Sequence, residues 1–426
     1  MTDVNLINNL WVILAAVLVF IMTVSVGLLE VGEVGERFWN SLLKTIVITC
    51  AALFIMAFVG FNTAFAPTID GIIGNPFYNG IFLGGFSTNA PGILSGVWWS
   101  MDSSYFGTGL TTGTYFLFEA AFASVTLALV GVIGLRKLKL EAFAAFSIVY
   151  FILIWNLPAA WVWNPTGWLY LMGVRDFAGG LIVHGAAGAA GLAIVYRIWQ
   201  EEKKKGLKES PAVNLSVSPG WLTLSILLLW VGWFGFNPGS VLAFNNEATV
   251  VVLTTFLAAA SAFISTMFFK YLIDKKNPGL PYAANGILIG LIIITPLAGF
   301  VSPASSVILG VLGGPLYLAG EKWFGRYRWF SDPVSLFPGH LLGGVFGVAM
   351  IAFFTQNAFA AASGNSNLPD GLLFGGGFAA AQQLGLEMFA VAVVLVVVFV
   401  ISYVSMWLIG LLMHGITTDY GKEEVS

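Results

Sequence analysis

Two of the three histidines stand in the same sequence setting, eight residues after an aspartate. Asp176 precedes His184 in the stretch DFAGGLIVH, Asp332 precedes His340 in DPVSLFPGH, and a glycine-rich stretch follows each histidine. Two neutral imidazoles that face each other can share a proton, since one ring nitrogen donates and the other accepts. Such a pair would suit a proton relay or a small polar molecule, whereas it lacks the oxygen cage that replaces the hydration shell of Na⁺ or K⁺.

A zinc site is the alternative use of two histidines. Zinc needs three or four ligands, but the only cysteine is Cys50 and no nearby acid completes a set. We therefore expect no metal and no cofactor. We expect Asp176 and Asp332 to cap the helices that they precede, where a negative charge complements the helix dipole, and direct contact with a ligand is the alternative for both. The third histidine, His414, is expected to be structural or interfacial.

The composition indicates which elements must position these side chains. The chain has 426 residues, of which 58% are hydrophobic and only 9% charged, whereas a soluble domain carries about 25% charged residues. This excludes a cytosolic enzyme, a secreted disulfide scaffold and a nucleic-acid-binding protein, and the net charge of −3 provides no basic stripe for phosphates. Long apolar runs predict an all-α integral membrane protein in a lipid bilayer rather than a β-barrel.

We predict eleven transmembrane helices, because a helix needs about 20 apolar residues to cross a bilayer. The first run follows no basic segment and is long enough to stay, so we expect no cleavable signal peptide. The eighth and ninth runs are short. The apolar runs cover Leu10–Leu29, Leu42–Phe65, Gly113–Gly134, Ala142–Trp163, Phe177–Trp199, Trp221–Ala243, Val250–Ile273, Gly286–Phe300, Ser305–Ala319, Phe337–Phe354 and Leu384–Met413.

The basic residues predict the orientation of these helices. With the N-terminus outside and the C-terminus inside, every lysine and arginine except Arg175 falls in an inside segment, as the positive-inside rule requires. We expect a multi-pass protein of the plasma membrane. We predict a membrane domain over residues 1–414 and a short cytoplasmic tail or linker stub over residues 415–426.

The two aspartate–histidine stretches predict an inverted repeat. The first begins the fifth helix and the second begins the tenth, so the two copies cross the membrane in opposite directions. A 5+5 inverted repeat followed by one long final helix is expected to hold its functional site near the midplane, between the two halves. Eight residues of helix rise about 12 Å, which would carry each histidine into the hydrocarbon.

Aromatic side chains are placed to form the mouth of a pore. Phe118 and Phe122 share one face of the third helix, Trp163 ends the fourth helix, and Ser240 closes the stretch WFGFNPGS of the sixth. An aromatic cup attracts a small cation by about 0.5–2 kcal/mol per ring, and a hydroxyl can accept a hydrogen bond from that cation. Packing of a core is the alternative for the aromatic residues.

In these motifs the sequence resembles the ammonium transporter family (Amt/Mep/Rh). The matching stretches are FEAAFASVT (118–126), DFAGGLIVH (176–184), LLWVGWFGFNPGS (228–240) and DPVSLFPGH (332–340). The resemblance implies that ammonium or ammonia is the substrate and that the protein is a homotrimer with one pore in each subunit. It implies an outer substrate site of Phe118, Trp163 and Ser240 supported by Asp176, a gate of Phe122 and Phe236, and twin pore histidines at His184 and His340.

The resemblance also implies a mechanism. Ammonium is close to K⁺ in size, so size alone cannot select it. We expect aromatic ring faces and a hydroxyl to recognise ammonium at the outer site. Ammonium would then lose a proton and cross as ammonia while the histidines relay the proton, which K⁺ cannot imitate.

Three features depart from the family pattern. The stretch after the first helix, LEVGEVGER (29–37), is acidic rather than basic, Glu119 stands where relatives carry glutamine, and the chain ends soon after the last helix. Glu119 is a further candidate for contact with the substrate, and the alternative is a protonated carboxyl bonded within the helix bundle. A carboxylate that binds a cation tightly favours occupancy over throughput.

These departures keep a second function open. The protein could be an ammonium sensor, the membrane input module of a signalling protein with a fused or associated cytoplasmic domain. An enzyme is not expected, because the sequence offers no nucleophile, metal cluster or nucleotide-binding loop.

Overall fold

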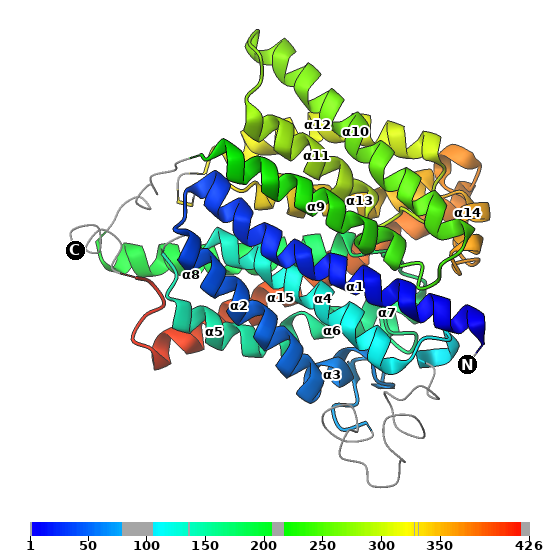
Figure 1. The fold of residues 1–426 in the computed structure, drawn as a ribbon, viewed down its shortest axis with the longest axis horizontal. Coiled ribbons are helices and arrows are strands. Elements are labelled where there is room, and N and C mark those ends of the chain that lie inside the picture. Colours follow the sequence, from blue (N-terminus) through cyan, green and yellow to red (C-terminus); the bar gives the residue numbers. More distant parts are fainter. Residues whose placement is uncertain are drawn as a thin grey trace.

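A computed structural model describes residues 2–78, 105–134, 137–206, 217–327, 329–330 and 332–418. These residues form a bundle of long helices in which α1 begins at one end and α15 finishes at the other (Figure 1). Residues 79–104 and 207–216, which connect predicted helices, and most of the predicted tail (419–426) lie outside the described residues. So do the basic residues Arg136, Lys208, Arg328 and Lys422.

The first half of the bundle alternates α-helices with short π-helical segments. Its elements are α1 (Asp3–Leu29), η1 (Glu30–Val34), α2 (Phe38–Ile55), η2 (Met56–Gly60), α3 (Phe61–Phe65), α4 (Thr112–Ile133), α5 (Leu140–Val149), η6 (Tyr150–Ile154), α6 (Asn156–Val162), α7 (Trp168–Met172), η7 (Gly180–Gly185) and α8 (Ala186–Lys204). A two-stranded antiparallel ribbon, β1 (Thr68–Ile69) and β2 (Ile73–Gly74), and a 3₁₀ turn, η5 (Tyr105–Gly107), lie between α3 and α4.

The second half continues in the same way. Its elements are α9 (Pro219–Gly239), α10 (Asn246–Asp274), α11 (Leu280–Ile294), α12 (Pro303–Phe324), η8 (Leu336–Leu341), α13 (Leu342–Phe354), α14 (Asn357–Ala362), the 3₁₀ turn η9 (Leu372–Phe374) and the long α15 (Gly377–Leu412).

Each predicted apolar run contains a helix. In the part of the chain that the structure describes, ten helical stretches are long and apolar enough to cross a membrane, and α11 is a shorter apolar helix of 15 residues. The eighth helix differs from its predicted range, 286–300: α11 starts six residues earlier, at Leu280, and ends at Ile294. Pro296 has no amide hydrogen with which to continue a helix, and Pro281 starts one at its first turn.

Glycines let the helices approach closely. Gly232 and Gly235 of α9 face α1, where an added Cβ would collide with Met22 and with the backbone of Ala15. Gly310 of α12 faces α10 in the same manner, against the backbone of Ala258. Small residues suit contacts between membrane helices, because lipid tails are as apolar as leucine and close packing of the helices favours their association.

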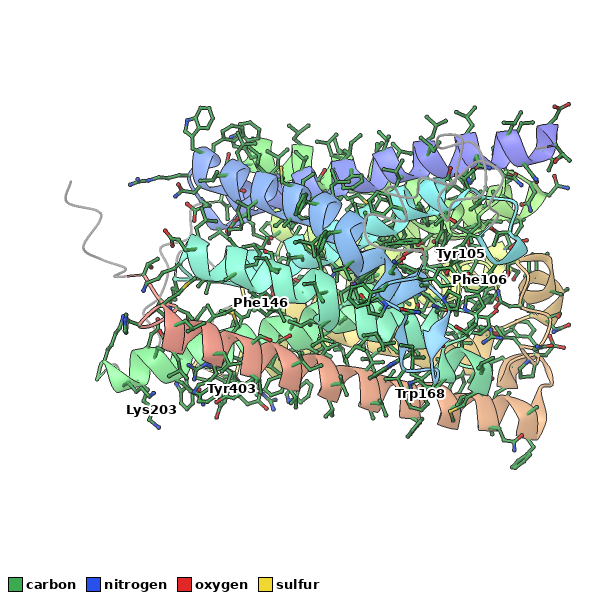
Figure 2. The ribbon with its side chains drawn as sticks, turned by 90° about the horizontal axis from the view of Figure 1, so that it is seen from below. Tyr105, Phe106, Phe146, Trp168, Lys203 and Tyr403 are labelled. Atoms are coloured by element: carbon green, nitrogen blue, oxygen red, sulfur yellow. The ribbon has the colours of Figure 1, made fainter. Side chains whose placement is uncertain are left out.

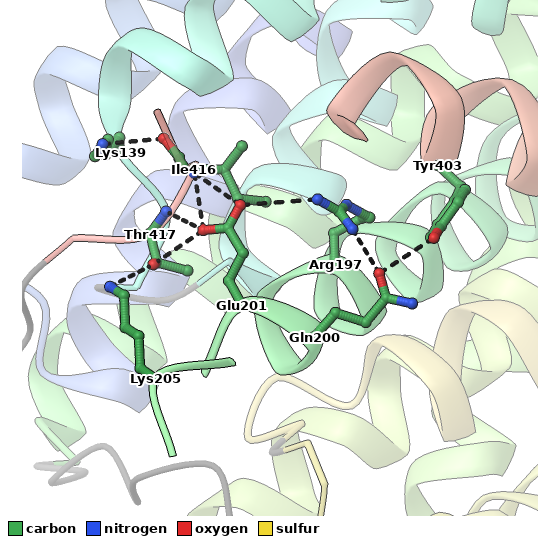
Figure 3. Close-up of polar contacts among 9 residues, drawn as sticks. Lys139, Arg197, Gln200, Glu201, Lys205, Tyr403, Ile416 and Thr417 are labelled. Carbon is green, nitrogen blue, oxygen red and sulfur yellow. Dashed lines mark hydrogen bonds and ion pairs between the residues drawn. The ribbon is translucent and has the colours of Figure 1, made fainter. Parts of the chain in front are cut away.

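A cluster of charged residues fastens the end of the described chain to α8 (Figure 3). The Glu201 carboxylate accepts hydrogen bonds from the backbone N–H of Ile416 at 2.9 Å and from the N–H and hydroxyl of Thr417 at 3.2 and 3.1 Å. Lys205 donates to the Thr417 hydroxyl at 3.0 Å, and Lys139 donates to the Gly415 carbonyl at 2.9 Å. Residues 415–418 are therefore bound to the helix bundle.

Figure 2 shows the two ends of the bundle from the side. Lys203 and Tyr403 lie toward one end, and Tyr105 and Trp168 lie toward the other. The candidate site lies between these ends.

Candidate functional site

The two histidines meet in the interior of the bundle. His184 in η7 and His340 in η8 place their Nδ1 atoms 3.0 Å apart, with ring centroids 5.1 Å apart and planes tilted by 48°. At this distance one Nδ1 donates and the other accepts a hydrogen bond. His184 is 1% exposed and His340 is 5% exposed. The structure thus joins two residues that are 156 positions apart in the sequence.

The two aspartates cap the π-helical segments that carry the histidines. Asp176 accepts four backbone hydrogen bonds from residues 179–182 at 2.7–3.0 Å. Asp332 accepts two, from Leu336 at 2.9 Å and Phe337 at 2.8 Å. Burial raises the pKa of Asp176, and its four hydrogen bonds lower that pKa in part. Burial also raises the pKa of Asp332, to about 6.

Both aspartates follow the capping interpretation, since their oxygens are occupied by backbone N–H groups. The turn between aspartate and helix needs a left-handed residue in each copy. Gly179 fills this position in the first copy with φ 111°, and Ser335 fills it in the second with φ 56°. A serine has a Cβ and adopts this conformation less readily than glycine.

A glycine four residues after each histidine brings the two halves together. An added Cβ on Gly344 would collide with the Gly180 carbonyl and would lie in tight contact, at 3.0 Å, with the Cβ of His184. An added Cβ on Gly188 would collide with Leu341. Each half therefore packs a glycine against the residues that flank the histidine of the other half.

Aromatic rings form a column beside His184. The rings of Phe122 and Phe236 lie 4.3 Å apart at 34°, and Phe118 lies 4.7 Å from Phe122. Below them, the His184 ring is nearly parallel to Phe236, at 6.0 Å and 15°. Trp233 lies on the same ring at 6.0 Å and 22°. Phe122 and Phe236 therefore separate the histidines from the cavity on the Phe118 side.

That cavity, here called the outer cavity, has a volume of about 310 Å³. All of the predicted substrate-contacting residues line it: Phe118, Glu119, Trp163, Asp176 and Ser240. The Ser240 hydroxyl donates to the Phe236 carbonyl at 2.9 Å, which leaves its oxygen to accept a hydrogen bond. The Trp163 indole donates to the Asp176 carbonyl at 2.7 Å.

Three further residues of this cavity were not expected from the sequence. Arg175, Tyr105 and Tyr170 line it as well. Arg175 had a signal of its own, because it is the basic residue that the topology leaves outside. Its backbone N–H donates to Glu387 of α15 at 3.0 Å, and burial lowers the pKa of its guanidinium.

A second cavity, here called the inner cavity, has a volume of about 520 Å³ and borders η8. Glu33, Tyr317, Glu321, Asp332 and Ser335 are among its lining residues. Glu33 comes from the acidic stretch that departed from the family pattern. Between the two cavities, His184 and His340 line a space of only about 10 Å³, together with apolar side chains such as Val125 and Leu129.

No group of three or more histidine, cysteine, aspartate or glutamate side chains that could hold a metal ion occurs among the described residues. The two histidines instead hydrogen-bond to each other. Fold and site thus define a multi-pass helical membrane protein with a buried histidine pair and two cavities.

Comparison with known proteins gives the family. The model of the Ammonium Transporter Family matches residues 10–425. An ammonium transporter of Bacillus subtilis is 30% identical over 408 residues, covering 95% of this chain and 92% of the relative. Ammonium transporter Amt1 of Archaeoglobus fulgidus is also 30% identical, covering 86% and 84%. The chain belongs to the ammonium transporter family.

Solved structures agree with this assignment. A sensor Amt protein superposes with a TM-score of 0.81 at 25% identity and covers 97% of this chain and 95% of its own. Mep2 of Saccharomyces cerevisiae superposes with a TM-score of 0.80 at 24% identity and covers 99% and 91%. The latter likeness establishes a shared fold.

Proposed function

We propose that this protein binds ammonium in the outer cavity and transports it as ammonia past His184 and His340. The observation that carries the proposal is the 3.0 Å contact between two buried imidazoles directly below an aromatic pair. The family of the chain, and the ammonium transporters among its relatives, support ammonium as the substrate.

The outer cavity recruits the cation. The rings of Phe118 and Trp163 attract ammonium by cation–π interaction, and the Ser240 oxygen accepts one of its hydrogen bonds. Asp176 supports this site through its backbone, because its carbonyl accepts the Trp163 indole N–H. The aromatic ring faces and the Ser240 oxygen thereby replace the water molecules around the ion. K⁺ has no N–H group to donate to that oxygen, so it gains less at this site than ammonium does.

At the gate and the histidines, ammonium loses a proton and continues as neutral ammonia. Phe122 and Phe236 are in contact, so passage needs a displacement of at least one ring. A dry path penalises an ion, and ammonium escapes the penalty by giving up one proton. The Nε2 atom of His184 is buried and has no hydrogen-bond partner among the described residues, so it takes up the proton that ammonium loses. The Nδ1 proton of His184 then moves to Nδ1 of His340, and His340 releases its Nε2 proton toward the inner cavity.

The topology that we propose is eleven transmembrane helices with the N-terminus outside and the C-terminus inside. Opposite ends for the start of α1 and the finish of α15 support an odd number of crossings (Figure 1). The reciprocal contacts of Gly188 and Gly344 support an inverted 5+5 repeat followed by α15. We further propose a homotrimer in the plasma membrane with one pore in each subunit, a membrane domain over 1–414 and a cytoplasmic tail or linker over 415–426.

A sensor remains the second candidate function. Two observations favour it: the likeness to a sensor Amt protein and the carboxyl of Glu119 in the outer cavity, which would retain a cation. In that case a fused or associated signalling domain would follow residues 415–418, which are bound to α8 by Glu201. Ammonium binding in the cavity would reach this domain through α8.

The test is an electrical recording on proteoliposomes. Wild-type protein should give a saturable current on an ammonium jump and none on a K⁺ jump. His184→Ala and His340→Ala should each abolish the ammonium current or admit K⁺, because either change removes the imidazole contact. Unchanged current and selectivity in both variants would contradict a proton relay through the two histidines.

The same recordings separate the two functions. Specific ammonium binding to wild-type protein without any current would favour the sensor. A matched control is His414→Ala, since this histidine lies beyond the end of α15 and does not line the path. It should leave the current and its selectivity unchanged.

A further inference from the structure

Glu119 is a buried acid with no ion-pair partner among the residues that the structure describes. It lies on α4 between Phe118 and Phe122, is 4% exposed and lines the cavity. Its Oε2 atom has no hydrogen-bond partner among the described residues. An oriented acceptor of this kind, enclosed beside a ring-lined space, is suited to a cation with N–H donors.

The titratable neighbours of Glu119 come from several elements. The cavity presents Tyr105 of η5, Tyr115 of α4, Tyr170 of α7, and Arg175 and Asp176 before η7. The Tyr115 hydroxyl is the hydrogen-bonding neighbour of the Glu119 carboxyl, and the rings of Tyr105 and Tyr115 are stacked at 4.1 Å. Neutral phenols supply hydrogen bonds to a carboxylate but no positive charge.

Arg175 is the one cation among the described residues that line this cavity, and its guanidinium is held away from Glu119. The Arg175 guanidinium donates to the carbonyls of Tyr170 and Val174 at 2.9 and 2.8 Å and lies over the Tyr170 ring at 4.3 Å. No ion pair joins it to Glu119 among the described residues. Asp176 is occupied by four backbone N–H groups. Glu119 is therefore the acid whose Oε2 atom is available to a ligand in the cavity.

Burial decides the charge of such a group. A carboxylate enclosed by protein without a partner cation is costly, and the group avoids the cost by keeping its proton. A cation in the cavity removes the cost, because the carboxylate then has a partner at hydrogen-bond distance. The charge of Glu119 must therefore follow the occupancy of the cavity.

We propose that binding of ammonium in the outer cavity displaces the proton of Glu119 to the outside solution, so that the carboxylic acid becomes a carboxylate paired with the ion. One N–H···O hydrogen bond forms, one O–H bond breaks, and the net charge of the cavity is unchanged. This inference rests on the proposed function, since it takes the cavity to be the ammonium site. Binding of ammonium is then an exchange of one proton for one ammonium ion.

The exchange has a measurable consequence. While Glu119 is protonated in the empty cavity, the apparent Kd for ammonium should fall about tenfold for each unit by which the pH rises. Occupancy is then set by the ratio of ammonium to protons rather than by ammonium alone. A variant without the carboxyl should bind ammonium with an apparent Kd that does not depend on pH.

The experiment is calorimetric titration of the purified full chain in detergent with ammonium chloride, at one pH near 7, in two buffers of different ionisation enthalpy. The dependence of the observed heat on the buffer gives the number of protons released. We expect about one proton per ammonium for wild-type protein and none for Glu119→Gln. Potassium chloride, added in the same way, should release none.

Controls guard against a folding defect. Glu247→Gln is the matched control, because Glu247 is also buried with an oxygen lacking a partner among the described residues, yet it does not line the outer cavity. It should release protons as wild type does. Glu119→Asp keeps a carboxyl and should retain part of the release even where Glu119→Gln elutes as aggregate.

The outcomes are separable. Ammonium binding by wild-type protein with no proton release, or equal release from Glu119→Gln and wild type, overturns the exchange and leaves the proposed function intact. Absence of ammonium binding together with absence of ammonium current overturns both. Release of a proton that disappears in Glu119→Gln and persists in Glu247→Gln establishes the exchange.

Discussion

The segment that carries His184 and the segment that carries His340 share one plan but differ in their surroundings. In each, an aspartate caps a π-helical turn, a histidine follows eight residues later, and a glycine four residues beyond it contacts the opposite half. Around the first histidine stand the rings of Trp233 and Phe236. Behind the second lies a cavity lined by carboxyl groups, among them Glu33 and Asp332.

The difference indicates which part of the repeat is fixed by geometry and which part is free to serve chemistry. Backbone turn, cap and glycine contact must match in both copies, since together they bring two rings to 3.0 Å. The surrounding side chains need not match, because one copy faces the outer cavity and the other the inner cavity. The first copy is also the more strongly capped, with four hydrogen bonds to Asp176 against two to Asp332.

The largest expected effect comes from separating the two copies. Gly344→Ala places a methyl group against the Gly180 carbonyl and the His184 side chain, and overpacking of this kind costs typically about 1–3 kcal/mol. The histidine contact should be lost, and the ammonium current of proteoliposomes should fall at least about tenfold, as a barrier increase of about 1.4 kcal/mol requires.

A neighbouring glycine provides the control for that substitution. Gly339→Ala adds the same methyl group one residue before His340, where the nearest atom is 3.9 Å away. It should retain the current within about twofold, since a difference of a few tenths of a kcal/mol is all that ordinary contact would produce. Equal loss of current in both variants would contradict the close approach at Gly344.

The two caps should differ next. Asp176→Asn replaces one acceptor oxygen by an amide nitrogen that cannot accept, so two of the four backbone N–H groups lose their acceptor, and each buried donor left unsatisfied costs about 1–3 kcal/mol. We expect a loss of about 2–5 kcal/mol in the free energy of unfolding for Asp176→Asn and about half of that for Asp332→Asn. Thermal unfolding in detergent, followed by tryptophan fluorescence, measures both, and an equal loss would remove the asymmetry.

The pH dependence of stability should distinguish the inner copy. The pKa of Asp332 is raised to about 6 in the folded protein, above the usual value near 3.9. A raised pKa means that the folded state binds the proton more tightly, so its stabilisation is complete below about pH 4 and lost as the pH rises through about 6. Melting temperatures measured from pH 4 to pH 7 should therefore fall, and Asp332→Asn should flatten the change.

The smallest expected effect lies at the far end of the first copy. Glu201→Gln weakens the contacts that hold Ile416 and Thr417 against α8. We expect a loss of about 1–2 kcal/mol in stability, as for other charge-assisted hydrogen bonds that are part-buried, and little change in ammonium selectivity. Protease cleavage after Lys205 or beyond residue 418 should become faster in this variant. An unchanged cleavage rate would show that the contacts of Glu201 do not restrain residues 415–418.

Much of the fold follows from composition and spacing. Apolar runs gave the helices, because a chain with so few charged residues has to bury its backbone in lipid as helix. Pro296 shows where such reasoning is too coarse, since hydropathy continued across it while the helix ended at Ile294. Of the site, the pairing of His184 with His340 and the gathering of Phe118, Trp163 and Ser240 were expected from spacing and from the family pattern.

What the sequence determined was therefore the periodic part of this protein: helices, caps and matched histidines, each a consequence of local hydrogen bonding and hydrophobicity. Tertiary structure alone decided that the Oε2 atom of Glu119 is buried without a hydrogen-bond partner among the described residues, and that a methyl group at residue 344 would collide with the Gly180 carbonyl. Both features depend on how side chains from different helices fill the space between them rather than on local sequence.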